Sequence, residues 1–267
     1  TWIVVDADPE QSELLVAPVS DQGHAPQWVG ELPPTPADVA REAGRLRRLF
    51  AIDLGLMQDE EVIEIDPAEL IKGESKLGDY PLNGEAKGIL AEIVATHFDS
   101  AGMIPSDRLI TIEDRDEALV INSCQGNRIN EALGHYLLAM ASTRSGKWGR
   151  LIVEPCRISL QVGGVTPREI IDWLRDTPPE ALEGVLSVTL PNSREVRWRF
   201  AQIAKIFGIL RHGVDPRKIN IQALLKKYRG TPVLDEVLSK LFHERMDVIG
   251  ASDVMRAIQS GLIGLEV

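Results

Sequence analysis

The sequence predicts an α+β fold in which a small, barrel-like antiparallel sheet is flanked by helices and followed by a helical C-terminal third. Strand-like segments occur in pairs joined by short polar turns, which is typical of antiparallel hairpins. The segments between these pairs carry apolar residues at helical spacing, and the chain reads as helical from residue 195 onward. Strands are too few per helix for a doubly wound parallel sheet. We therefore predict an α+β domain over residues 1–190 and a helical subdomain over residues 191–267 that packs on it.

The N-terminal part of the chain is predicted to form a hairpin and two helices. Residues 2–5 and 14–16 are apolar and flank a turn-forming Asp-Pro-Glu sequence. After a loop rich in Gly and Pro, Thr35 and Pro36 are typical of the N-cap and first position of a helix, which we expect to run to about residue 50. Its apolar face is predicted to be Val39, Ala43, Leu46 and Phe50, and its basic side Arg41, Arg45, Arg47 and Arg48. Residues 86–98 form a second amphipathic pattern.

The rest of the chain first alternates strand pairs with helices and then becomes helical. The predicted strand pairs are residues 109–112 with 118–121, and residues 151–153 with 157–162. One helix is expected over residues 130–142, between the pairs, and another follows Thr166-Pro167. Beyond residue 195 we expect four short helical segments, broken at Gly213, Gly230 and Gly250.

Charge is distributed very unevenly along the chain. The net charge of −11 at pH 7 argues against non-specific binding of nucleic acid over the whole surface, because phosphates require positive potential. Nearly all charged residues in the segment 53–74 are Asp or Glu, whereas most charged residues in the segment 194–229 are Arg or Lys. Any phosphate-binding surface is therefore expected to be local.

Composition also indicates the class of protein. No apolar segment approaches the roughly 18 residues that cross a bilayer, and no signal-peptide pattern opens the chain, so we expect a cytoplasmic protein. The chain begins at Thr1, inside a strand-like run, which suggests a fragment of something longer. Cys124 and Cys156 have no Cys or His neighbours at zinc-site spacing, so we expect reduced, buried thiols and no metal.

Signatures of nucleotide binding and of common hydrolases are missing from the sequence. It contains no G-x-x-x-x-G-K-[ST] loop and no G-x-G-x-x-G after a strand, so we expect this chain to bind neither ATP nor another cofactor. Ser145-Gly146-Lys147 lacks the first glycine and the downstream hydroxyl of such a loop. Neither a G-x-S-x-G elbow nor an H-E-x-x-H motif is present.

A series of short sequence blocks covers nearly the whole chain. They are residues 2–18, 26–31, 39–47, 105–108, 122–130, 154–158, 197–200 and 231–236. In this order they resemble the large-helicase-related (Lhr) family of superfamily 2 helicases, specifically the accessory (DEAD/H-associated) domain that follows the winged helix. The pattern departs from the family at Gln125, where Phe is frequent, and at Cys156, where an aromatic residue is frequent.

The resemblance implies a parent enzyme that hydrolyses ATP with Mg²⁺ and unwinds duplexes in the 3′-to-5′ direction. Its motor and winged-helix domains would be partners within the same parent chain. The accessory domain itself is expected to grip single-stranded DNA or RNA through the backbone and by stacking on bases, without a catalytic role of its own in ATP hydrolysis.

Candidate nucleic-acid ligands follow from residue type and position. Trp28 lies in a loop, where its indole either stacks on a base or anchors the loop on the sheet. Arg108, Arg128 and Arg157 stand at strand edges or a helix start, in blocks that also supply Asn130. Guanidinium groups beside helix N-terminal amides can cradle phosphate, although these arginines could equally pair with Asp107 or Glu154.

A second set of basic residues lies on the helix predicted after residue 193. Arg194, Arg197 and Arg199 form either a solvated face or a rail that follows phosphates. The spacing of Trp198 and Phe200 among other apolar residues predicts that they belong to the core.

Two other functions fit the sequence. The domain could be a DNA glycosylase-like module that flips and excises a base, and Asp107 or Glu31 would then be the carboxylate. It could also be a structural brace for the motor domains that never contacts the strand.

Overall fold

The structure is a computed structural model that describes residues 2–8, 11, 13–18, 33–57, 77–115, 118–211 and 219–267. The chain divides into two compact units. The larger unit comprises Pro34–Leu186 and Arg245–Val267, and the smaller comprises Thr1–Pro33 and Ser187–Glu244. Of the described helices, none is long and apolar enough to cross a membrane.

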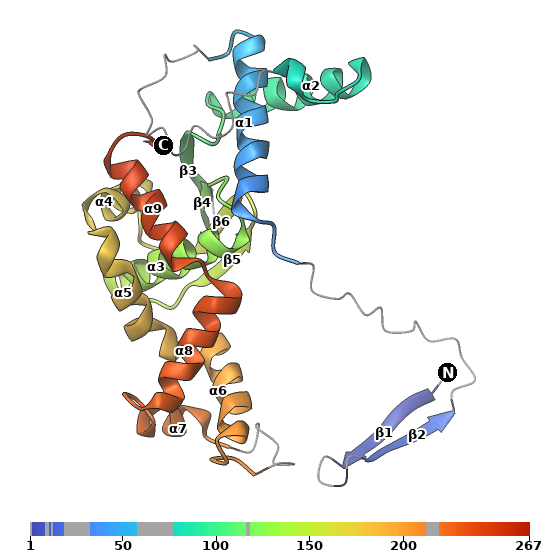
Figure 1. Ribbon diagram of the computed structural model, residues 1–267, viewed down its shortest axis with the longest axis vertical. Coiled ribbons are helices and arrows are strands. Elements are labelled where there is room, and N and C mark those ends of the chain that lie inside the picture. Colours follow the sequence, from blue (N-terminus) through green and yellow to red (C-terminus); the bar gives the residue numbers. More distant parts are fainter. Residues whose placement is uncertain are drawn as a thin grey trace. The chain divides into compact units, whose positions relative to one another are not determined.

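An open five-stranded sheet forms the centre of the larger unit (Figure 1). Its strands are β3 (Leu109–Arg115), β4 (Ala118–Asn122), β5 (Arg150–Glu154), β6 (Arg157–Gln161) and β7 (Gly264–Glu266). The order is β5-β6-β4-β3-β7, with antiparallel pairs except for β7, which lies parallel to β3. The α+β class and both predicted strand pairs are confirmed. The barrel is not, because β5 and β7 stand at opposite edges of the sheet and do not pair.

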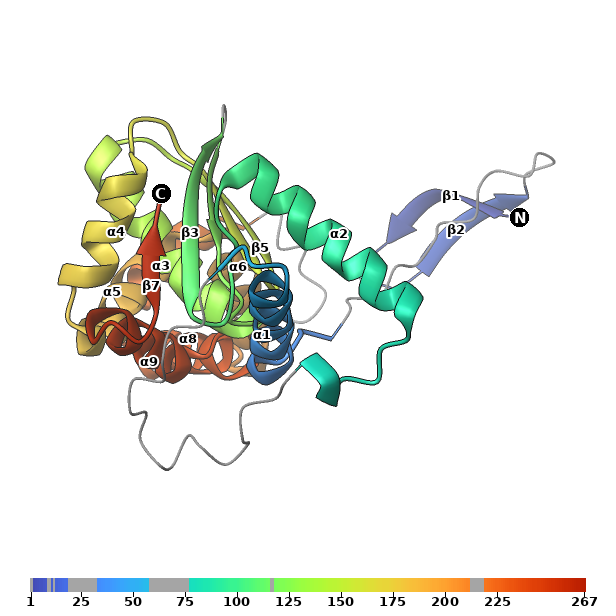
Figure 2. The same ribbon diagram turned by 90° about the horizontal axis from the view of Figure 1, so that it is seen from above.

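Helices cover the sheet on both sides. They are α1 (Ala37–Asp53), α2 (Gly84–Ala101), α3 (Asn127–Ser145), α4 (Pro167–Asp176) and α9 (Val248–Gln259), with short 3-10 turns η1 (Leu77–Asp79) and η2 (Pro179–Ala181). Figure 2 shows α4 and α9 on one side of the sheet and α2 on the other. The sheet face packed on α3 is apolar: Ile158 and Leu160 of β6 are fully buried, as is Tyr136 of α3. The Tyr136 hydroxyl lies 2.6 Å from the Thr177 hydroxyl, so this buried ring keeps a hydrogen bond.

Helix α1 packs through a different face from the predicted one: of the predicted apolar residues, Phe50 is buried, but Val39 and Ala43 are exposed. The structure buries Ala40, Gly44 and Ala51 together with Phe50, whereas Val39 is 54% exposed. The reason is a close approach: a Cβ at Gly44 would lie 2.7 Å from the backbone nitrogen of Asp107. Small residues therefore let α1 lie directly on the loops of the sheet.

The predicted caps have two different outcomes. Thr166 caps α4 in a capping box with Glu169, as its sequence position indicated. Thr35 does not cap α1, which has Pro36 at its N-cap. Instead, Thr35 exchanges two hydrogen bonds with Asn127, at the start of α3. A tertiary contact has thus replaced the local cap.

The smaller unit contains the N-terminal hairpin and most of the C-terminal helices. β1 (Trp2–Asp8) pairs with β2 (Glu13–Pro18) in antiparallel fashion, as predicted. The helical part comprises α5 (Leu182–Thr189), which crosses from the larger unit, η3 (Leu190–Asn192), α6 (Arg194–Ile206), α7 (Ile221–Lys227) and α8 (Pro232–Arg245). Phe200 is fully buried, but Trp198 is 63% exposed, so its predicted core position is wrong. It projects opposite the buried stripe that contains Val196 and Phe200.

The C-terminal third is not entirely helical, contrary to the prediction. A break does occur at Gly230, which has a φ of 70°. Gly250 lies inside α9, and the chain instead breaks just before Asp247, which caps that helix. The last strand, β7, completes the sheet of the larger unit. Gly213 lies outside the described residues.

Candidate nucleic-acid interface

Three loops meet at one end of the five-stranded sheet. They are residues 105–108 before β3, 122–130 after β4, and 154–158 at the turn from β5 to β6. Two backbone hydrogen bonds join the second and third loops, from Ser123 N to Cys156 O at 3.0 Å and from Gly126 N to Pro155 O at 2.9 Å. We call this region the three-loop cluster. It brings together three of the blocks on which the sequence resemblance rests.

The buried side chain of Asn130 joins two loops of the three-loop cluster. Its side chain is fully buried, and Nδ2 donates to the carbonyl oxygens of Ser123 at 2.9 Å, Glu154 at 3.0 Å and Pro155 at 3.1 Å. Buried carbonyls need such partners, so Asn130 fixes the two loops relative to each other. Its position is therefore structural and not at the surface, where a phosphate ligand was expected.

The arginines of α1 contact the three-loop cluster and do not form the solvent-exposed basic face that the sequence suggested. Arg48 forms a bidentate ion pair with Asp107, in which Nε donates to Oδ1 at 2.9 Å and Nη2 donates to Oδ2 at 3.0 Å. The Nε of Arg41 donates to Gln125 at 2.7 Å, and Nη1 of Arg47 lies 3.6 Å from the sulfur of Cys124. Asp107 is thereby held in place, with only 13% of its side chain exposed.

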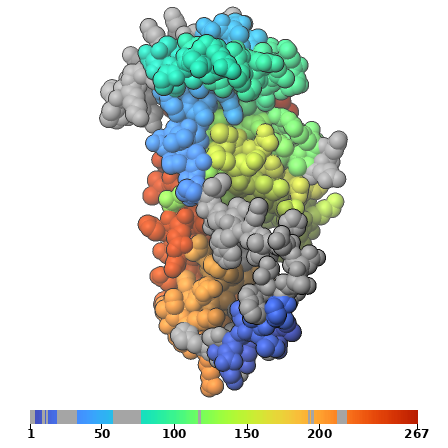
Figure 3. Space-filling view, turned by 90° about the vertical axis from the view of Figure 1, so that its right-hand side faces the viewer, coloured from blue at the N-terminus to red at the C-terminus, as the bar shows by residue number. Residues whose placement is uncertain are grey.

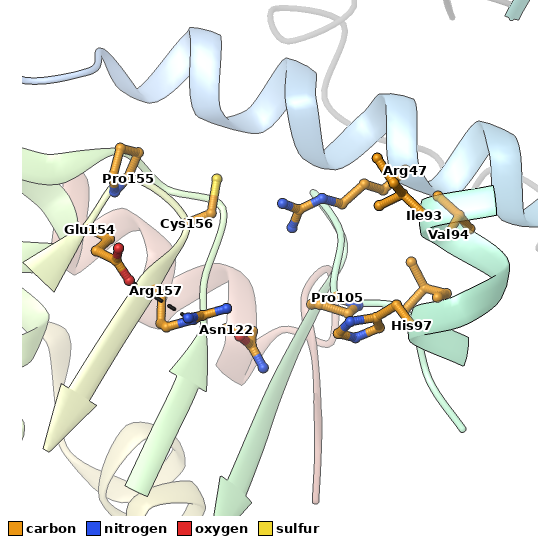
Figure 4. A pocket seen from close by; sticks show the side chains of 11 residues that line it. Arg47, Ile93, Val94, His97, Pro105, Asn122, Glu154, Pro155, Cys156 and Arg157 are labelled. Carbon is orange, nitrogen blue, oxygen red and sulfur yellow. Dashed lines mark ion pairs between the residues drawn. The ribbon is translucent and has the colours of Figure 1, made fainter. Parts of the chain in front are cut away.

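A cavity of about 350 Å³ opens between the three-loop cluster and the helices α1 and α2 (Figure 4). The space-filling view shows α1 and α2 next to the β5–β6 hairpin on this face of the larger unit (Figure 3). The cavity is lined by Arg47, Ile93, Val94, His97, Ile104, Pro105, Asn122, Glu154, Pro155, Cys156 and Arg157. It thus combines apolar walls from α2 with two guanidinium groups.

Arg157 is the more accessible of the two cavity arginines. Half of its side chain is exposed, and its ion pair with Glu154 is long at 3.8 Å, so this pair stabilises the fold little. Arg47 extends from α1 over the cavity (Figure 4). Burial lowers the pKa of His97, and the nearby Arg47 adds to this effect against the opposing carboxylate of Glu113. At neutral pH, His97 therefore presents an uncharged imidazole to the cavity.

The other predicted ligands of the larger unit lie away from this cavity. The Arg128 guanidinium donates to the carbonyl of Met246 at 3.3 Å and so ties α3 to the segment before α9. The backbone of Arg108 accepts a hydrogen bond from Gly264 N at 2.8 Å, which anchors β7. Neither side chain lines the cavity, and neither does Asp107.

The predicted basic rail lies on α6 in the smaller unit. The Nε of Arg197 donates to the carbonyl of Ser193 at 3.3 Å, and Arg199 forms an ion pair with Glu244, with 15% of its side chain exposed. Arg194 begins this helix, but its side chain lies outside the described part of the structure. Trp28 and Glu31 also lie outside the described residues.

The most exposed aromatic side chain of the described residues, Trp148, was not among the predicted ligands. Trp148 is 88% exposed in the turn between α3 and β5, and its neighbours Lys147 and Arg150 are exposed too. The sequence does indicate its exposure, because Trp148 is flanked by glycines and basic residues and is not part of a periodic apolar pattern. The resemblance of Ser145-Gly146-Lys147 to part of a phosphate-binding loop is weaker evidence for a binding site than the exposed Trp148, because that loop is incomplete. No comparable sequence signal points to Arg47, whose place in the cavity depends on how α1 packs.

Comparisons with known proteins agree with this architecture. Residues 104–267 match the DEAD/H associated family model. The chain is 25% identical over 262 residues to the ATP-dependent helicase Lhr-Core of Saccharolobus solfataricus, covering 91% of this chain and 29% of that protein. It is 23% identical over 252 residues to the Lhr-Core helicase of Sulfolobus acidocaldarius, covering 88% and 28% respectively.

A solved structure has the same fold. The Mycobacterium smegmatis helicase Lhr, bound to single-stranded DNA and AMP-PNP, superposes with a TM-score of 0.64 at 18% identity. The match covers 93% of this chain and 32% of that one, so the chain spans less than a third of these relatives. The chain belongs to the DEAD/H associated family, the accessory domain of Lhr-type superfamily 2 helicases.

Proposed function

We propose that this chain is the nucleic-acid-binding accessory domain of an ATP-dependent 3′-to-5′ helicase, and that it grips single-stranded DNA or RNA to couple translocation to unwinding. ATP and Mg²⁺ would act in motor domains elsewhere in the parent protein. The observation that supports this most is the convergence of four family blocks, residues 39–47, 105–108, 122–130 and 154–158, on a cavity lined by Arg47 and Arg157. The M. smegmatis relative was solved with single-stranded DNA, which agrees with the proposal.

The cavity suits a nucleotide chemically. Arg157 can offer a charge-assisted hydrogen bond to a phosphate oxygen, since its existing partner is distant. Ile93, Val94 and Pro105 supply apolar surface for a sugar or base. These contacts do not read sequence, as expected for a translocating enzyme. Because the whole chain carries a charge of −11, binding depends on this local concentration of positive groups.

The exposed turn at Trp148 offers a second contact. A free indole beside two cations can stack on a base of any identity, for about 1–3 kcal/mol. Trp28, Arg108, Arg128, Arg194, Arg197 and Arg199 remain further candidate contacts of the same strand. Base excision has less support, because it requires an available carboxylate and Asp107 is bound to Arg48.

The test is a binding series with fluorescently labelled single-stranded DNA and RNA at several salt concentrations. Arg157→Gln is compared with Arg168→Gln, which removes the same charge from a 73% exposed position on α4. Loss of one phosphate contact should weaken binding at low salt and lower the slope of log K against log salt by about 0.7 in Arg157→Gln alone.

Equal effects of the two substitutions would contradict a role for the cavity. Absence of any binding at low salt would favour the structural brace. Release of uracil from a uracil-containing strand, measured in the same samples, would favour the glycosylase.

A further inference from the structure

The two cysteines of the chain lie next to each other in the three-loop cluster. Cys124 and Cys156 are the only cysteines in the sequence, 32 positions apart. A backbone hydrogen bond of 3.0 Å between Ser123 N and Cys156 O joins their loops, and each thiol lies close enough to the other to shift its pKa. Cys124 is fully buried, as predicted for both thiols, but Cys156 is partly exposed and lines the cavity.

We propose that Cys156 is a peroxide-reactive modification site and that Cys124 resolves its oxidised form as an intramolecular disulfide. The geometry supplies a nucleophile that solvent can reach, a second thiol on the adjoining loop, which a backbone hydrogen bond joins to Cys156, and a cavity through which a small peroxide can enter. The inference does not depend on whether the cavity binds nucleic acid.

The surroundings of the two sulfurs give them different roles. The nearby Cys124 thiol lowers the pKa of Cys156 to about 6, and the positive charges of Arg47 and Arg157 act in the same direction. Partial burial and the carboxylate of Glu154 oppose this shift. The nearby Cys156 thiol and burial raise the pKa of Cys124, and Asp107 adds to that effect. Cys156, which is partly exposed and whose pKa is lowered, is therefore the more nucleophilic of the two thiols.

The reaction consumes one hydrogen peroxide for each disulfide. The Cys156 thiolate attacks one peroxide oxygen, the O–O bond breaks, and hydroxide leaves, so the sulfur is oxidised to sulfenic acid while peroxide is reduced. The Cys124 sulfur then attacks the sulfenic sulfur, the S–O bond breaks, and the Cys124 proton leaves with the hydroxyl group as water. A thiol reductant reverses the disulfide by exchange.

The first experiment treats the purified protein with hydrogen peroxide, alkylates the remaining thiols, and measures intact mass. The expected product is two mass units lighter and takes up no alkylating reagent, and dithiothreitol restores both reactive thiols. Tryptic digestion should give residues 116–128 linked to residues 151–157. Uptake of two alkyl groups after peroxide treatment would overturn the proposal.

Two variants separate the roles of the cysteines. Cys124→Ser should accumulate a sulfenic acid on Cys156 that dimedone traps, because the resolving thiol is gone. Cys156→Ser changes a partly exposed position and leaves only the buried thiol, which should not react. Peroxide consumption at an unchanged rate in Cys156→Ser would refute the assignment.

The rate of alkylation against pH provides an independent measure. Alkylation of Cys156 should have its midpoint well below that of an ordinary cysteine, at about pH 6. A midpoint at the ordinary value for free cysteine would contradict the activated thiolate.

Discussion

Gly44 allows the sharpest prediction about stability, because its surroundings set the sign of the effect. A Cβ at this position would lie 2.7 Å from Asp107 N and 2.9 Å from both Ser106 C and Cys124 Cβ. Two of these three atoms belong to the backbone and cannot rotate away. Substitution by Ala would therefore push α1 off the three-loop cluster.

The magnitude follows from two opposing effects. Ala is favoured over Gly inside a helix by about 1 kcal/mol. Overpacking costs about 1–3 kcal/mol, and the upper end of about 3 kcal/mol applies here, because two of the three contacted atoms are backbone. We expect Gly44→Ala to lower the free energy of unfolding by about 2 kcal/mol, which corresponds to a decrease in Tm of roughly 4–8 °C for a protein of this size.

Gly88 provides the matched control. It lies in α2 and is exposed, and a Cβ added there would meet no atom of the described residues within 4 Å. Gly88→Ala should therefore raise the free energy of unfolding by up to about 1 kcal/mol. Thermal and urea unfolding of the two variants measure both changes. If Gly44→Ala were as stable as Gly88→Ala, the close packing of α1 on the loops would be refuted.

Two further predictions concern the three-loop cluster and the Trp148 turn. Asn130→Ala removes the side-chain donor from the carbonyls of Ser123 and Glu154, while the Pro155 carbonyl keeps its hydrogen bond from Gly126 N. The substitution should therefore destabilise the protein by about 2 kcal/mol or more in urea unfolding. Asn122→Ala, whose partners are the rotatable side chains of Thr111 and Glu113, should cost less. Trp148→Ala should leave Tm within about 1 °C of the parent, because an 88% exposed side chain buries little surface, but weaken single-strand binding about tenfold. Trp148→Phe should restore much of that binding, and unchanged affinity in Trp148→Ala would remove this turn from the interface.

Local signals identify most of the elements of the larger unit. Residues 130–142 and 86–98 are predicted as helices, and the structure extends them to Asn127–Ser145 and Gly84–Ala101. Both strand pairs of the sheet are predictable because alternation and turn chemistry act within about ten residues. The Thr166 cap is readable for the same reason, since its partner Glu169 lies three residues away.

Long-range contacts decide what these signals cannot. β7 joins β3 through a pairing between residues more than 150 positions apart, and Gly264 pairs with Leu109. No local pattern encodes such a pairing, so the sheet could not be recognised as open. The same limitation applies to the arginines of α1, whose partners Asp107 and Gln125 come from loops distant in the sequence.

The sequence by itself determined the α+β class, the family resemblance, the absence of an ATP-binding loop from the chain, and the positions of most helices and hairpins. These properties depend on periodicity, caps and motifs that act between near neighbours. Only the tertiary structure showed that four family blocks surround one cavity, that Asn130 and Asp107 are held by internal contacts, and that Cys124 and Cys156 lie on adjoining loops. Those properties depend on which distant segments the sheet and α1 bring together, because burial and partner choice arise only when the chain has packed.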